Sequence, residues 1–191
     1  MACTRPTICI AVGGYPGRDG LGHTLAVTWN GTRWRVLKTP SPGTRLSDLA
    51  SVSCASPVSC IAVGSYLNIG QPFTTTLAEQ WNGTSWRALP PLRTGRGGSL
   101  LAISCTGATH CIALGAQVRP GHAGPLAEAW NGTTWRMLPT ANLGTANGNL
   151  LSISCPRADR CTAAGDYFGT ADNARPLTEE WNGSRWRLTN Q

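Results

Sequence analysis

The chain has 191 residues, of which 41% are hydrophobic and 13% charged, and its formal net charge at pH 7 is +7. This composition excludes a disordered chain, and no apolar run approaches the ~20 residues that a membrane-spanning helix needs. The sixteen basic residues stand apart from one another. We therefore expect a solvated basic surface, with no nucleic-acid partner and no membrane span.

A unit of about fifty residues recurs four times along the chain. Four tryptophans that each precede an Asn-Gly pair set the period: Trp29, Trp81, Trp130 and Trp181. The repeats predict a single domain whose units cover approximately residues 1–45, 46–97, 98–147 and 148–191.

Each unit reads as four short strands, and the second unit shows them in order. The apolar and β-branched stretches 48–54 and 60–67 are separated by a turn-forming segment, Ala-Ser-Pro-Val-Ser. The stretches 74–81 and 85–90 follow after a loop. No stretch has the period of an amphipathic helix, so two hairpins per unit and an all-β fold are predicted.

The second hairpin of each unit carries the phrase Trp-Asn-Gly. Asn82-Gly83 is a pair that readily takes positive φ, which predicts a two-residue type I′ turn with Trp81 opposite Thr84. Trp81 and Trp86 would then lie diagonally on one face and pack together. We interpret the eight tryptophans as packing residues, with ligand stacking as the alternative, and the Asn-x-Ser/Thr match as a by-product of the turn.

Eight cysteines recur in pairs six positions apart, and each pair flanks the turn of the first hairpin. Cross-strand Cβ atoms lie close enough there for a disulfide. The predicted bridges are Cys3–Cys9, Cys54–Cys60, Cys105–Cys111 and Cys155–Cys161. Four bridges favour an oxidising compartment, and hence an extracellular or cell-surface protein, although no signal peptide is visible in this chain. Eight free thiols in a cytosolic protein are the alternative.

The cysteine spacing is wrong for a zinc site, and the three histidines do not recur at equivalent positions. We therefore expect no metal and no cofactor.

The order of features in residues 9–42 resembles the kelch repeat: a hydrophobic strand ending in Gly13-Gly14-Tyr15, a variable loop, a further strand, a turn and a tryptophan. The cysteine pair and the Trp-Asn-Gly phrase resemble the kelch-like repeats of secreted bacterial proteins. The resemblance implies a β-propeller of four four-stranded blades, with one disulfide in each blade.

Charges recur at equivalent positions in this arrangement. Glu79, Glu128 and Glu179 share one position, where the first unit has Val27, and Arg35, Arg87, Arg136 and Arg187 share another. A Glu of one blade pairing with an Arg of the next is expected to hold the blades together.

The sequence leaves open whether the four units close into a ring. The first unit lacks most of the apolar first strand that the others have. A closed four-bladed ring is the favoured expectation. A piece of a longer array and a homo-oligomer that completes the ring are the alternatives.

No catalytic constellation is evident, and three repeated glutamates indicate structure rather than an asymmetric acid–base pair. We therefore expect no enzyme activity. The loops between second and third strands vary most, and Tyr15, Tyr66, Gln117 and Tyr167 recur where they begin. These four residues are the candidate ligand-binding residues of an extracellular binding or adhesion module that recognises a glycan or a protein. The alternative is an accessory domain or fragment of a larger secreted carbohydrate-active enzyme.

Overall fold

The computed structural model describes residues 1–91, 97–144, 146–168 and 173–189. Within these ranges the chain forms sixteen β-strands and no helix, and hence no helix that could cross a membrane. The strands make four antiparallel sheets, each built from four strands in chain order. The predicted all-β class, with four units of four strands each, is confirmed.

The strands are distributed evenly over the four repeats. The first sheet contains β1 (Ala2–Arg5), β2 (Ile8–Pro16), β3 (Gly22–Trp29) and β4 (Trp34–Leu37). The second contains β5 (Leu46–Ser56), β6 (Ser59–Leu67), β7 (Thr75–Trp81) and β8 (Trp86–Ala88). The third contains β9 (Gly98–Gly107), β10 (His110–Arg119), β11 (His122–Trp130) and β12 (Trp135–Leu138). The fourth contains β13 (Asn147–Arg157), β14 (Arg160–Phe168), β15 (Ala174–Trp181) and β16 (Trp186–Leu188).

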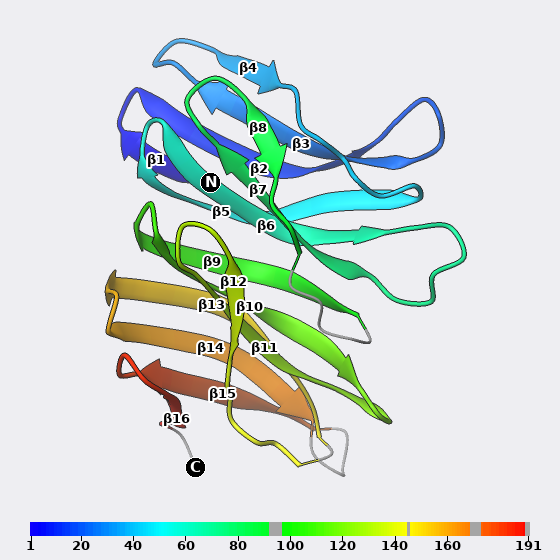
Figure 1. The fold of residues 1–191 in the computed structure, drawn as a ribbon, viewed down its shortest axis with the longest axis vertical. Helices are drawn as coiled ribbons and strands as arrows, with labels where there is room; N and C mark the ends of the chain where they lie inside the picture. The colour runs from blue at the N-terminus through cyan, green and yellow to red at the C-terminus, as the bar shows by residue number, and fades with distance from the viewer. Residues whose placement is uncertain (92–96, 145, 169–172, 190–191) are drawn as a thin grey trace.

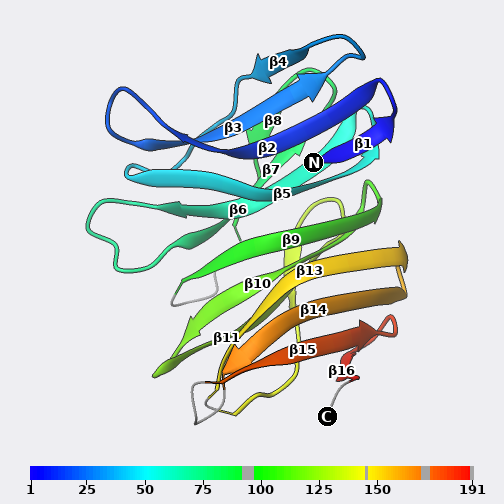
Figure 2. The ribbon, with the colours of Figure 1, turned by 180° about the vertical axis from the view of Figure 1, so that it is seen from behind.

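The sheets are stacked face to face in chain order (Figures 1 and 2). The first strand of each sheet packs against the preceding sheet, β5 against β2 and β3, β9 against β5 and β6, and β13 against β9 and β10. The first and fourth sheets lie at opposite ends of the stack, so the expectation of a closed four-bladed ring is wrong.

The outer faces of the two end sheets differ in chemistry, which agrees with the open arrangement. Ile112 and Leu138 of the third sheet are buried against the fourth, whereas their counterparts in the fourth sheet are the exposed Thr162 and Thr189. The opposite end is apolar, because Trp34 of the first sheet is 46% exposed. Water therefore suits the outer face of the fourth sheet better than that of the first.

All four predicted disulfides are present, one in each sheet: Cys3–Cys9, Cys54–Cys60, Cys105–Cys111 and Cys155–Cys161. Each joins the first two strands of its sheet across the short turn between them. They indicate a protein made for an oxidising environment.

The Trp-Asn-Gly hairpin differs from its prediction. Trp81 pairs directly with Trp86, and the backbone N–H of Asn82 donates to the carbonyl of Ser85 at 3.3 Å, so the loop has four residues instead of two. Only Gly83 takes a positive φ, of 95°. The carboxamide oxygen of Asn82 instead accepts the backbone N–H groups of Thr84 and Ser85, at 2.9 Å each, and this side-chain acceptor shapes the turn.

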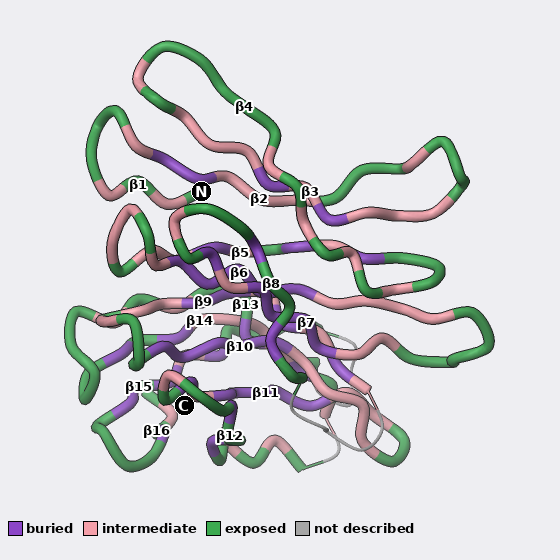
Figure 3. The backbone as a smooth tube through the Cα atoms, turned by 45° about the horizontal axis from the view of Figure 1, so that its top comes forward, coloured by how far each residue is buried: buried purple, intermediate pink, exposed green. Residues whose placement is uncertain are grey.

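The tryptophans pack in pairs within each hairpin, with ring centroids 5.3 to 5.7 Å apart. In the second, third and fourth sheets both indoles of the pair are buried against the preceding sheet. Figure 3 shows the buried backbone running through the middle of the stack, with the hairpin ends exposed. The packing role of these six tryptophans follows from their burial.

Candidate functional site

The four candidate residues lie at equivalent positions near the ends of β2, β6, β10 and β14, within strands rather than loops. Tyr66 and Tyr167 pack against the apolar cores shared with the preceding sheets. The Gln117 amide donates to the carbonyl of Pro125 at 3.2 Å. Tyr15 is 47% exposed, because its sheet is the first of the stack. The structure places the four residues on four different sheets, and does not gather them into one site.

A cleft of about 660 Å³ opens between the first and second sheets, beside Tyr15. Its walls come from the loop that joins β2 to β3 and from the segment that leads into β5. Tyr15, Pro16 and Leu21 line one wall, and Arg45 and Asp48 line the other. The volume falls within the usual range for small-ligand sites.

The loop from residue 16 to residue 22 is held in place by its own hydrogen bonds. The backbone N–H of Gly17 donates to the carbonyl of Leu21 at 2.7 Å. The Asp19 carboxylate accepts the N–H of Leu21 at 3.1 Å and lies 2.9 Å from Nε2 of His23, whose ring packs against Tyr15 with centroids 5.5 Å apart. The hydrogen bond to His23, together with that from Leu21, holds the pKa of Asp19 below its ordinary value. This wall of the cleft is therefore preorganised.

Gly14 allows the Asp48 carboxylate to approach the first sheet. A Cβ atom on Gly14 would lie 2.3 Å from Oδ1 of Asp48, whereas a Cβ on Gly13 would meet nothing within 4 Å. Steric fit therefore explains the glycine at position 14, because the missing side chain makes room for the Asp48 carboxylate at the cleft.

Asp48 differs from its counterparts in the other repeats. The equivalent residues are Ser99 and Asn149, and the Asn149 amide donates to Asp166 at 3.1 Å. In the described part of the chain the Asp48 side chain has neither a hydrogen bond nor an ion pair, and Arg45 likewise makes no salt bridge there. The cleft thus offers a carboxylate and a guanidinium that are free to contact a ligand.

The glutamates occupy the junctions between sheets, but not as predicted. Glu79, Glu128 and Glu179 are buried. Oε1 of Glu79 accepts the hydroxyl of Thr24 in the preceding sheet at 3.3 Å, and Glu179 accepts the N–H of Ala141 at 3.4 Å. Burial raises the pKa of Glu79 to about 7 and that of Glu128 to about 8.

The predicted pairing of these glutamates with arginines of the neighbouring sheet is wrong. The arginines Arg35, Arg87, Arg136 and Arg187 are exposed, and the two salt bridges among the described residues involve neither set. Arg87 instead donates to Oε1 of Gln80 on the adjacent strand, at 2.6 Å. A long charged side chain gains more from solvent and an exposed partner than from a desolvated junction.

Sequence reasoning missed Asp48 and Arg45, which form the polar wall of the cleft. The available signal was the departure from the repeat at position 48, where the other units carry neutral residues. An asymmetric residue in a symmetric framework is a better indication of a ligand site than a repeated one, since repetition also serves packing.

Within the described ranges, no three His, Cys, Asp or Glu side chains gather as metal ligands. The repeated glutamates are buried within the stack and do not line the cleft. The charged groups that the cleft presents to a ligand are the Asp48 carboxylate and the Arg45 guanidinium.

No family model matches the chain, and no curated protein matches it. A solved structure described as "YCF48 bound to D1 peptide" is similar, with 13% sequence identity and a TM-score of 0.47. The match covers 87% of this chain and 48% of that one, so this chain spans about half the length of that protein.

Proposed function

We propose that the protein is an extracellular, non-catalytic binding module with kelch-like repeats, and that it binds a glycan in the cleft between its first two sheets. The observation that carries the proposal is the unpaired Asp48 carboxylate facing a loop that is already ordered. A ligand that meets such a wall gains charge-assisted hydrogen bonds without the cost of ordering the loop.

The composition of the cleft favours a glycan. A sugar presents several hydroxyl groups that both donate and accept, together with apolar C–H faces. Asp48 accepts, Arg45 donates, and Pro16 and Leu21 supply apolar surface. These groups suit a neutral, polyhydroxylated ligand better than an anion, which Asp48 would repel.

The proposal is tested on an array of neutral oligosaccharides and, in parallel, on a peptide array. The variants Asp48→Ser and Arg45→Ala introduce the residues that the third and fourth repeats carry at equivalent positions, so the fold should accept both. We expect Asp48→Ser to weaken binding of the retained oligosaccharide by about tenfold or more, because it removes a charged hydrogen-bond acceptor.

Asp159→Ser is the matched control, since it removes an exposed carboxylate from the fourth sheet. It should leave the affinity unchanged. If the protein is retained on the peptide array and not on the oligosaccharide array, its ligand is a protein rather than a glycan. If the same sample hydrolyses a glycoside substrate and retains no ligand, the proposal of a non-catalytic binding module is wrong.

The compartment and the assembly state belong to the same proposal. The four disulfides support an oxidising, extracellular location. A homo-oligomer that completes the ring would have to set the apolar outer face of the first sheet against the threonine-bearing face of the fourth. That chemical mismatch favours contacts between first sheets of two copies instead.

A further inference from the structure

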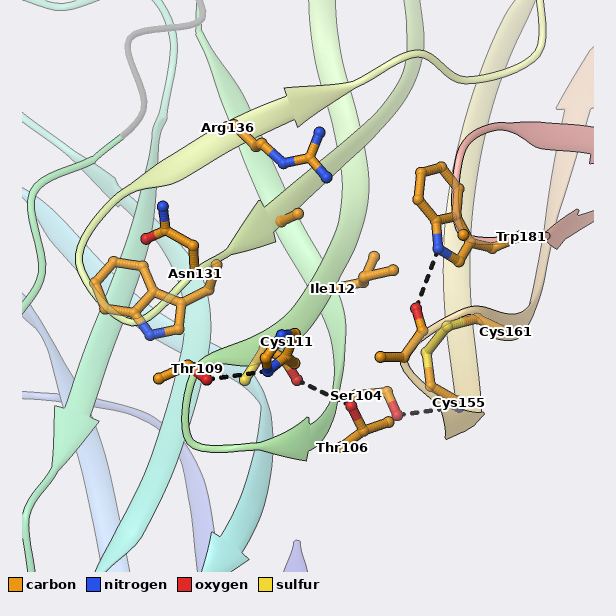
Figure 4. A pocket seen from close by; sticks show the side chains of 15 residues that line it. Ser104, Thr106, Thr109, Cys111, Ile112, Asn131, Arg136, Cys155, Cys161 and Trp181 are labelled. Carbon is orange, nitrogen blue, oxygen red and sulfur yellow. Dashed lines mark hydrogen bonds between the residues drawn. A yellow bond between two sulfur atoms is a disulfide. The ribbon is translucent and has the colours of Figure 1, made fainter.

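A second cavity, of about 300 Å³, lies between the third and fourth sheets near their disulfides (Figure 4). Arg136 of β12 lies on the side of the third sheet, and Trp181 of β15 lies on the side of the fourth. Ile112 forms part of its apolar wall, and hydroxyl groups of Ser104 and Thr109 also line it. This cavity is separate from the cleft beside Tyr15, which lies between other sheets.

The third repeat departs from the second at one position that lines the cavity, Ala129. In the second sheet Gln80 pairs with Arg87, and its carbonyl oxygen accepts from two nitrogens of that guanidinium, at 2.6 and 3.2 Å. In the third sheet the equivalent pair is Ala129 and Arg136. Alanine leaves the space open and removes the acceptor, so the Arg136 guanidinium is not held on its own sheet.

The matching gap beside the disulfides of the first two sheets is closed. Between the first and second sheets, the gap lined by Ile10 and the disulfide cysteines has no room for a water molecule. The cavity beside the disulfides of the third and fourth sheets is therefore not a feature that every repeat produces.

The polar groups of the cavity are mainly donors. Arg136 brings a permanent positive charge, and no carboxylate lines the cavity. The carboxamide oxygen of Asn131 already accepts the N–H groups of Thr133 and Thr134, so its NH₂ group is the part left to bind a ligand. The Ser104 hydroxyl oxygen accepts the N–H of Cys155 at 3.1 Å, which leaves its proton to donate. Such a lining favours an oxyanion.

We propose that this cavity binds a small organic anion, with the carboxylate or phosphate group on Arg136 and an apolar ring against Ile112 and Trp181. A guanidinium matches either oxyanion in a two-point hydrogen bond. The indole supplies a flat surface for the ring, and its own N–H is already used by the carbonyl of Ala158 at 3.2 Å.

The test is a titration of the intact, oxidised protein with benzoate, phenyl phosphate and benzyl alcohol, followed by NMR. Benzoate and phenyl phosphate distinguish the two oxyanions, and benzyl alcohol is the neutral analogue. We expect at least one anion to shift the Trp181 indole resonance in a saturable manner, and benzyl alcohol to bind at least tenfold more weakly.

Two variants examine the mechanism. Arg136→Gln removes the charge at an exposed position, and Ala129→Gln rebuilds the arrangement of the second sheet by filling the space and holding the guanidinium. Each should weaken anion binding at least tenfold, while Arg87→Gln, at the equivalent position of the second sheet, should not. Unfolding midpoints of the variants show whether each remains folded.

Three outcomes would overturn this site: no saturable binding of either anion, equal binding of benzyl alcohol, or unchanged anion affinity in folded Arg136→Gln protein. None of these outcomes bears on the glycan cleft, whose residues are not altered.

Discussion

Replacing the buried Glu79 by glutamine should change how stability depends on pH. The Glu79 side chain is fully buried at the junction of the first two sheets. Burial raises its pKa from 4.5 to about 7, against the opposing effect of hydrogen bonds from Thr24 and the Ser41 backbone. Because the folded-state pKa exceeds the unfolded one, folded protein holds more protons between these values, and its stability falls as the pH rises through that window.

The size of the effect follows from the shift. A difference of 7 minus 4.5 pH units, at 1.36 kcal/mol per unit, corresponds to about 3 kcal/mol once the carboxylate is fully ionised. Glutamine has the same shape, can keep the hydrogen bond from Thr24, and does not ionise. Glu79→Gln should therefore unfold at nearly the wild-type denaturant concentration at pH 5, and gain about 2 to 3 kcal/mol over wild type by pH 8.5.

The assay is urea unfolding with the disulfides intact, followed by tryptophan fluorescence at both pH values. Titration of all other groups is common to both proteins and cancels in the difference. Glu180→Gln, an exposed neighbour of the buried Glu179, is the control and should show no such pH-dependent gain. Equal pH dependence of wild type and Glu79→Gln would refute the reasoning.

Three further predictions concern the framework. The double variant Cys105→Ala/Cys111→Ala should lose about 2 kcal/mol of unfolding free energy in urea, because a short closed loop is released in the unfolded chain, and a loss below about 0.5 kcal/mol would be too small for that reason. Gly64→Ala should lower the thermal midpoint strongly, because its Cβ would lie 2.0 Å from the Asp48 carbonyl, whereas Gly13→Ala should not; similar midpoints for the two would contradict the steric account. Trp34→Asp should abolish any oligomer seen by native mass spectrometry, and an oligomer that survives it must use another face.

The disulfides and the four sheets were predictable because both depend on local sequence. Cysteines six positions apart, on either side of a turn, can meet only across the hairpin that the turn makes. The period of the Trp-Asn-Gly phrase set the number of units without any tertiary information.

Features that depend on a neighbouring sheet were not predictable in the same way. Tyr15, Tyr66 and Tyr167 look alike in sequence, but the last two are covered by a preceding sheet and Tyr15 is not. An arginine partner was predicted for Glu79, yet its carboxyl group instead accepts the hydroxyl of Thr24, and burial raises its pKa, which favours the neutral form over a buried ion pair. Repetition reveals equivalent positions, while their surroundings depend on the stack.

The turn was mispredicted for a local reason. Asn-Gly was expected to place two residues at positive φ, but only Gly83 adopts it. The asparagine side chain supplies an acceptor for the following N–H groups, which allows a longer loop and brings Trp81 and Trp86 directly opposite each other.

The most direct test of a glycan site between the first two sheets is NMR mapping of bound ligand. ¹⁵N-labelled protein is titrated with the oligosaccharide that the array retains best. We expect the largest amide shifts in residues 17–22 and 45–48, and we expect them to disappear in Asp48→Ser. Saturable shifts centred elsewhere, such as on the exposed face around Trp34, would contradict it.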